Sequence, residues 1–146
     1  MDLVPNFFDL ILSVWILHNQ LVYLVIATKQ EVAKNLVTKV RVMNQYLPSW
    51  LKQTTVEDNK LSLRYSNGSQ IKATSAAGDA GRSEALSLLV FDEAAFIDKI
   101  EDIWVSAQST LSTGGNAIIL STPNGVGNFF HKTWVGAEEE TNTFNT

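Results

Sequence analysis

Hydrophobic and polar positions repeat with two different periods along this chain, and each change of period marks a boundary between predicted elements. Two uncharged apolar segments, residues 10–17 and 21–28, are separated by His18, Asn19 and Gln20. The second segment is rich in β-branched and aromatic residues, which is typical of a buried strand. We therefore expect a helix, a polar turn and a core strand at the start of the chain.

A helical period follows the first predicted strand. Val32, Leu36, Val40 and Met43 recur at spacings of four, four and three residues, which predicts one apolar stripe on a helix over residues 29–46. Pro48 comes directly afterwards and cannot continue a helix.

Alternation with a period of two returns on both sides of an Asn67-Gly68 pair. The alternating apolar positions are Leu61, Leu63 and Tyr65 before the pair and Ile71 and Ala73 after it. Asn-Gly is a strong hairpin signal, because both residues tolerate positive φ. We expect a β-hairpin at the edge of the main sheet.

The second half of the chain alternates between short apolar runs and helical periods. We expect strands over residues 86–91 and 117–120, and helices from about Asp98 to Leu111 and over residues 128–139. Asp98 is the predicted cap of the first of these helices, with Glu101 as its capping-box partner. The apolar positions of the two helices are Ile100, Ile103, Trp104, Ala107 and Leu111, and then Phe129, Phe130 and Trp134. Strands alternating with helices predict a mainly parallel, three-layer α/β sheet.

Composition narrows the class of protein. With 146 residues, 45% of them hydrophobic and 18% charged, the chain is expected to form one folded domain. Its net charge of −4 argues against a broad nucleic-acid-binding face on this segment, and the lack of cysteine excludes disulfides and thiolate zinc sites. Residues 18–20 place polar groups in the middle of the uncharged apolar stretch over residues 10–28, so we expect no membrane span.

Two adjacent carboxylates, Asp92 and Glu93, follow the apolar run at residues 86–91. Ligands of open α/β folds bind at the carboxyl ends of strands, and carboxylates there are costly unless something positive engages them. In nucleotide hydrolases the first acid of such a pair holds the Mg²⁺ complex and the second activates the attacking water. A solvated turn after an ordinary strand is the alternative interpretation.

Three further side chains could act beside these acids. Ser121 and Thr122 follow the next predicted strand, and hydroxyls there can bond a phosphate or relay its presence. Arg82 lies in a Gly-rich loop before the acidic strand, where a guanidinium could stabilise phosphate charge. An ordinary turn and a solvated surface arginine are the competing interpretations.

A phosphate-binding loop of the Gly-x-x-x-x-Gly-Lys-Ser/Thr type does not occur in this sequence. Such a loop cradles the nucleotide phosphates with backbone N–H groups and a lysine. The acidic half of a nucleotide site is therefore predicted without its phosphate-binding half.

Six segments, taken in order, resemble the ATPase domain of the terminase large subunit, the DNA-packaging motor of tailed bacteriophages. They are residues 27–30, 47–51, 67–71, 88–97, 119–125 and 127–134, and the resemblance covers roughly residues 21–134. It implies a P-loop NTPase-like fold of the ASCE or RecA-like type, here incomplete because the phosphate-loop strand is missing. It also implies one partial ATPase domain over residues 1–146, without the nuclease domain of the family.

The resemblance implies a role for each candidate residue. Asp92 matches the Walker B acid for Mg²⁺ and Glu93 the catalytic glutamate, while Ser121 and Thr122 match the motif that couples ATP hydrolysis to movement. Arg82 resembles a loop arginine that in some members reaches the ATP of a neighbouring subunit, although Ser83 follows it where many relatives have glycine.

ATP and Mg²⁺ are the implied cofactors. Double-stranded DNA, a portal protein and a small terminase subunit are the implied partners, within a ring of identical subunits in the host bacterial cytoplasm.

Two alternatives remain at this point. A non-catalytic module could bind a portal or terminase subunits, and a helicase-like ATPase fragment would share the acidic strand and the hydroxyl tip. The chain is expected to be an internal fragment or the product of a broken gene, and to be poorly soluble because a sheet without one strand exposes an apolar edge.

Overall fold

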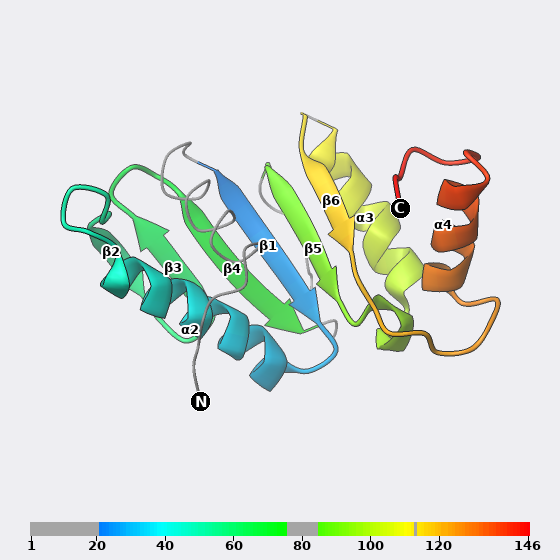
Figure 1. Cartoon of the computed structure of the whole chain (residues 1–146), viewed down its shortest axis with the longest axis horizontal. Coiled ribbons are helices and arrows are strands. Elements are labelled where there is room, and N and C mark those ends of the chain that lie inside the picture. The colour runs from blue at the N-terminus through cyan, green and yellow to red at the C-terminus, as the bar shows by residue number, and fades with distance from the viewer. Residues whose placement is uncertain (1–20, 76–84, 113) are drawn as a thin grey trace.

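A mixed sheet of six strands forms the centre of the molecule in a computed structural model that describes residues 21–75, 85–112 and 114–146 (Figure 1). The strand order is β2-β3-β4-β1-β5-β6. The strands are β1 Val22–Ala27, β2 Thr55–Asp58, β3 Ser62–Tyr65, β4 Gln70–Ser75, β5 Leu88–Asp92 and β6 Asn116–Ile119. The helices are α2 Gln30–Tyr46, the 3₁₀ helix η1 Ala94–Phe96, α3 Ile100–Leu111 and α4 Phe129–Glu138. The helix predicted over residues 10–17 lies outside the described residues.

Four neighbouring strands, β4, β1, β5 and β6, are parallel, which confirms the predicted fold class. In register, Ala27 of β1 lies opposite Asp92 of β5, and Phe91 lies opposite Ile119 of β6. The carboxyl ends of β1, β5 and β6 therefore meet at one edge of the sheet, where the loops that carry the acidic pair and the hydroxyl pair begin.

Strand β1 is buried on both faces because helices pack on either side of it. Tyr23, Val25 and Ala27 join a core with α2, β3 and β4, whereas Leu24 and Ile26 join a second core with β5 and α3. Figure 1 shows α2 in front of the sheet and α3 behind β6, with α4 beyond it. Residues 21–28 thus form a core strand, as their composition predicted.

The buried face of α2 differs from the predicted stripe. The buried residues are Ala33, Val37, Val40 and Asn44, while Val32, Leu36 and Met43 are half-buried. The cause is the position of the helix, which contacts β3, β4 and β1. Ala33, Val37 and Val40 are buried in the core that α2 shares with that part of the sheet. Val32 and Leu36 pack against this core, as do half-buried Leu88 and Ile118.

The predicted hairpin is confirmed, but it is a larger part of the sheet than expected. β3 and β4 pair antiparallel around Gly68, whose φ of 87° suits glycine. β4 also pairs parallel with β1, so only β3 and the unpredicted strand β2 extend beyond the parallel part. All four residues of β2 are exposed, and its register with β3 shifts between Thr55 and Glu57.

The two helices of the second half begin differently. Asn128 caps α4, accepting a hydrogen bond from the His131 N–H at 2.9 Å. The predicted capping by Asp98 is wrong: α3 begins at Ile100, its N-cap is Lys99, and that residue makes no side-chain capping bond. The intervening 3₁₀ helix and the left-handed Lys99 (φ 54°) shift the start, so Asp98 lies one residue too early to cap it. Within the described ranges, no helix is long and apolar enough to cross a membrane.

Candidate functional site

Asp92 is the last residue of β5 and lies at the carboxyl edge of the sheet. Its side chain shares a face with Val90, which belongs to the core under α2, because side chains alternate along a strand. Burial raises the pKa of the Asp92 carboxyl, the charge of Glu93 raises that pKa further, and Lys39 of α2 and the Glu93 backbone N–H lower it. A half-buried carboxylate whose ionised form is disfavoured by burial and by a neighbouring negative charge is suited to binding a cation.

Glu93 has an unusual backbone conformation directly after the strand. Its φ is 57° and its ψ 46°, in the left-handed region that a residue with a Cβ seldom occupies. The turn sends the side chain across to the neighbouring loop after β6. There Oε2 of Glu93 accepts hydrogen bonds from Thr122 Oγ1 at 2.9 Å and from the Thr122 backbone N–H at 3.3 Å.

The segment that follows Glu93 is hydrogen-bonded to the loop after β6. The Ala94 N–H donates to the Leu120 carbonyl at 2.9 Å, and the Ala95 N–H donates to Ser121 Oγ at 3.0 Å. The Ala95 carbonyl accepts from Asn124 Nδ2 at 3.0 Å. The tips of two adjacent parallel strands are therefore joined by side chains as well as by backbone.

The structure thus brings four of the predicted site residues together. Asp92 and Glu93 end β5, and Ser121 and Thr122 follow β6, with Thr122 bonded to Glu93. Ser121 bonds the backbone beyond the acids rather than the acids themselves. Arg82, the fifth predicted residue, lies outside the described residues.

Two contributors to the site were not predicted from the sequence. Lys39 acts on Asp92 electrostatically from α2, and Asn124 bonds the Ala95 carbonyl across a sequence separation of 29 residues. The helical period showed Lys39 only as one of several polar positions. Asn124 carried the signal of a turn residue, in the sequence Pro123-Asn124-Gly125, and that signal does not identify a distant partner.

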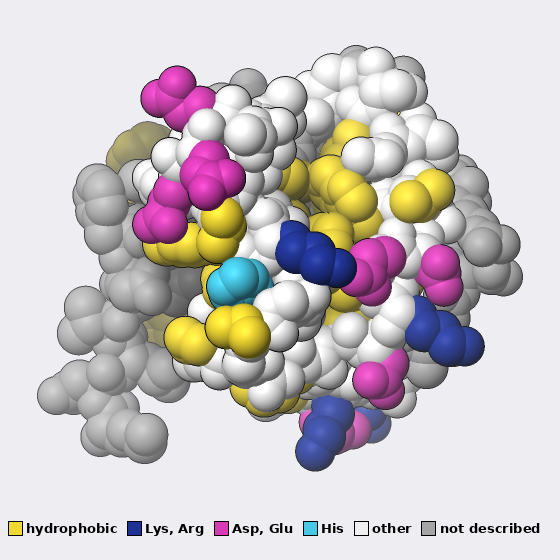
Figure 2. All heavy atoms as spheres, turned by 90° about the vertical axis from the view of Figure 1, so that its right-hand side faces the viewer, with side chains coloured by type: hydrophobic (Ala, Val, Ile, Leu, Met, Phe, Trp, Pro, Cys, Tyr) yellow, Lys and Arg dark blue, Asp and Glu magenta, His cyan; other side chains and the backbone are white. Residues whose placement is uncertain are grey.

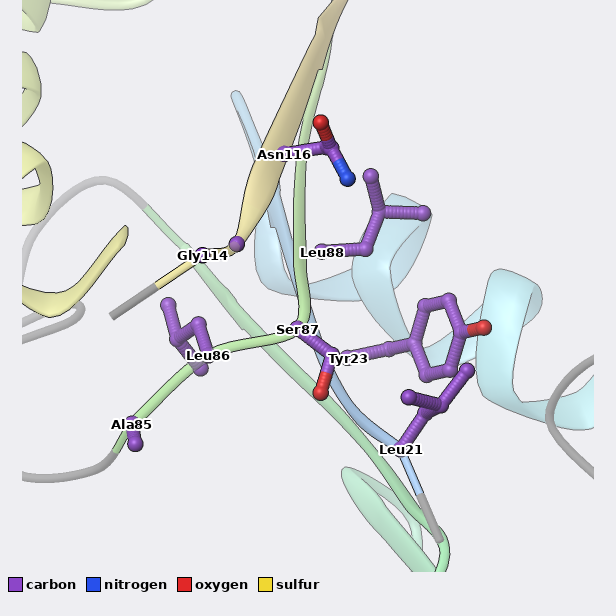
Figure 3. A pocket seen from close by; sticks show the side chains of 9 residues that line it. Leu21, Tyr23, Ala85, Leu86, Ser87, Leu88, Gly114 and Asn116 are labelled. Atoms are coloured by element: carbon purple, nitrogen blue, oxygen red, sulfur yellow. The ribbon is translucent and has the colours of Figure 1, made fainter. Parts of the chain in front are cut away.

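A pocket of about 370 Å³ lies at the opposite end of the strands (Figure 3). Leu21 and Tyr23 of the β1 segment, Leu86 and Leu88 around the start of β5, and Asn116 of β6 line it. It is separated from Asp92 and Glu93 by the length of β5, so it does not belong to the site at the carboxyl edge.

The side of the molecule that carries β6 and α4 has mixed character (Figure 2). Acidic, basic and apolar side chains alternate over its described part without a continuous basic patch. No group of three or more His, Cys, Asp or Glu side chains among the described residues is arranged to hold a metal ion.

The open, mainly parallel α/β sheet is of the RecA-like fold class, and solved structures share this fold. The Thermus phage P74-26 large terminase ATPase domain superposes with a TM-score of 0.64 at 24% identity, over 88% of this chain and 60% of that one. The large terminase of another thermophilic bacteriophage gives 0.68 at 13% identity, over 98% of this chain and 38% of that one. A structure of this second terminase in complex with ADP gives 0.61 at 14% identity, over 88% and 32%. This chain therefore spans 60% or less of the length of these relatives.

A family model that matches most of the chain shows which family the chain belongs to. The family model described as "Terminase large subunit, T4likevirus-type, N-terminal" matches residues 8–144. The chain belongs to this terminase large subunit family, which confirms the resemblance in the sequence and sets aside a helicase-like ATPase fragment.

Proposed function

We propose that this chain supplies the acidic half of the ATP-hydrolysing site of a viral DNA-packaging motor. One observation supports this most strongly: Glu93 at the tip of β5 is hydrogen-bonded to Thr122 at the tip of β6, directly beside Asp92. A site at the carboxyl edge of a parallel sheet, with one acid beside a cation site and a second held by a hydroxyl, suits phosphoryl transfer to water.

Asp92 is the residue proposed to hold Mg²⁺, directly or through water. The cation would relieve the unfavourable burial that raises the pKa of this carboxyl, and the fit is of the usual kind between hard oxygen and Mg²⁺. Bound Mg²⁺·ATP would supply a polarised γ-phosphate. Lys39 lowers the pKa of Asp92 from the α2 side and favours its ionised form.

Glu93 is the residue proposed to orient and deprotonate the attacking water. Both hydrogen bonds from Thr122 fall on Oε2, and Oε1 has no hydrogen-bond partner among the described residues. One oxygen therefore fixes the position of the carboxylate and the other can accept a proton from water. We propose that Thr122 transmits a change at the site to the loop after β6. Ser121 is proposed to do the same through its bond from the Ala95 N–H.

The wider assignments rest on the family. We propose double-stranded DNA, a portal protein and a small terminase subunit as partners, in a ring of identical subunits in the host bacterial cytoplasm. Within such a ring Arg82 would act on the ATP of a neighbouring subunit.

Release of inorganic phosphate from Mg²⁺·ATP by the purified chain tests the proposal. Glu93→Gln should lower the rate by at least about 100-fold, as expected for loss of a general base. The matched control is Glu101→Gln, because Glu101 is exposed in the first turn of α3 and lies outside the loops that follow β5 and β6. A rate that is equal in the wild type and Glu93→Gln would contradict the proposal.

A non-catalytic module is the second candidate, and one observation favours it: the sequence contains no Gly-x-x-x-x-Gly-Lys-Ser/Thr loop. In that case the chain releases no phosphate but still binds a portal or an intact terminase subunit. Titration of a purified portal and of a purified large subunit, followed by light scattering, separates the two. Binding that is unchanged in Glu93→Gln, without phosphate release, would support the module.

A further inference from the structure

A series of hydrogen bonds, connected by short stretches of backbone, runs from the acidic pair to the start of α4. It begins at Glu93, whose Oε2 is held by Thr122, and continues through Ala95, whose carbonyl accepts from Asn124 Nδ2 at 3.0 Å. The Asn124 backbone carbonyl in turn accepts from Asn128 Nδ2 at 2.8 Å. Asn128 is the N-cap of α4, so the series ends on a helix terminus.

Asn124 occupies the centre of this series because it makes bonds in both directions. Its side chain holds the segment after Glu93, and its main chain holds the cap of α4. The residues around it are exposed, and both Gly125 (φ 74°) and Gly127 (φ 81°) have positive φ. Such a loop has little packing of its own, and these hydrogen bonds are what define its position.

α4 also contacts the segment after the acids directly, since it packs against η1. Phe129, in its first turn, lies 6.3 Å from Trp104 of α3 between ring centroids. The N-terminal end of α4 is thus fixed by aromatic packing on one side and by the asparagine bonds on the other. A shift of the Ala95 backbone would change the second set of contacts and leave the first in place.

From this geometry we infer that Asn124 is a positioning residue that couples the conformation of Glu93 to the N-terminal turn of α4. The inference rests on the proposed function in one respect, because the Glu93 end becomes the input only if nucleotide acts there. α4 is then the element that receives the signal, and the asparagines at 124 and 128 carry it. A merely local turn would hold α4 equally well whatever the state of Glu93.

Hydrogen exchange of single backbone amides, followed by NMR on the full chain without nucleotide, tests the coupling. The perturbation is Thr122→Val, which removes the hydroxyl bond to Glu93, and the readout is the His131 amide, which donates to the cap residue Asn128. Thr122→Val should speed exchange of that amide about fivefold in the wild type and by no more than about twofold in an Asn124→Ala background. Thr122→Ser, which keeps the hydroxyl, should leave the rate unchanged.

The matched control is Asn142→Ala. Asn142 Nδ2 donates to the Thr133 carbonyl at 2.8 Å, an exposed asparagine-to-backbone bond of the same kind on the same helix, away from the site. In this background the full effect of Thr122→Val should persist.

An equal effect of Thr122→Val in the wild type and in Asn124→Ala, or none in either, overturns the inference. Because the measurement uses no nucleotide, its outcome is independent of the phosphate-release assay. Glu93-dependent hydrolysis without coupling refutes only the role of Asn124, and coupling together with hydrolysis that Glu93→Gln leaves unchanged refutes only the proposed function.

Discussion

The left-handed backbone of Glu93 leads to a prediction about stability that can be measured without any ligand. At φ 57° a residue with a Cβ loses about 1–2 kcal/mol relative to ordinary regions, and glycine does not. Glycine also has more freedom in the unfolded chain, which costs it about 0.4–1 kcal/mol. The difference predicts that Glu93→Gly is more stable than Glu93→Ala by about 0.5–1 kcal/mol. Both variants lose the bonds to Thr122, so that loss cancels in the comparison.

Urea unfolding of the two variants measures this difference as a shift of the midpoint at an unchanged slope. Lys99, with φ 54°, provides a second left-handed position, where glycine should again be more stable than alanine. Gln108 is exposed on the regular helix α3, and there the order should reverse, with alanine favoured by about 1 kcal/mol. Equal stability of Glu93→Gly and Glu93→Ala, with the reversal still seen at position 108, would refute the left-handed conformation of Glu93.

Three further changes have predicted outcomes. Asp92→Asn should raise the melting temperature at pH 7 and leave it unchanged near pH 3: the folded-state pKa of Asp92 is raised, so its unfavourable contribution grows as the pH rises through that pKa. Tyr65→Phe should be neutral or stabilising by about 1 kcal/mol in urea unfolding, because the buried Tyr65 hydroxyl has no hydrogen-bond partner in the described part of the chain. Burial also raises the pKa of Tyr65 from 10.0 to about 12, so the wild type should lose stability between those two pH values and Tyr65→Phe should lose less. Asn44→Ala should cost about 2 kcal/mol, since Asn44 exchanges two hydrogen bonds with the Gln53 backbone, whereas Asn35→Ala on the exposed face of α2 should cost under about 0.5 kcal/mol.

The two central strands, β1 and β5, could be predicted from the sequence because they are mostly buried. Short continuous apolar runs such as residues 21–28 and 86–91 are typical of strands that are buried on both faces of a sheet. β2 could not be predicted, because Thr55–Asp58 is exposed and forms a strand only through its pairing with β3. The face of α2 was rotated relative to the prediction, since Ala33, Val37 and Asn44 outside the predicted stripe are buried.

The candidate-site residues that lie directly at the ends of strands could be predicted from the sequence. Asp92, Glu93, Ser121 and Thr122 each come directly after an apolar run, and parallel pairing brings such positions to one edge. The contacts of Asn124 and the left-handed turn at Glu93 depend on how two loops pack against each other. The local periodicity of the sequence carries no information about that packing. The same is true of Asp98, which has the composition of a helix cap but lies one residue before the N-cap position.

The sheet has two dissimilar margins. β2 carries acidic side chains and an irregular register, features that discourage another strand from joining, whereas the segment from Asn116 to Leu120 has no charged residue and a regular backbone. β6 is also the terminal strand of the described sheet and the one that leads into Ser121 and Thr122. A polypeptide that joined β6 would lie about 4.8 Å from it, and so close to the Thr122 hydroxyl that bonds Glu93. The uncharged margin of the described sheet therefore lies next to the loop that bonds Glu93, whereas the acidic margin lies at the far side of the sheet.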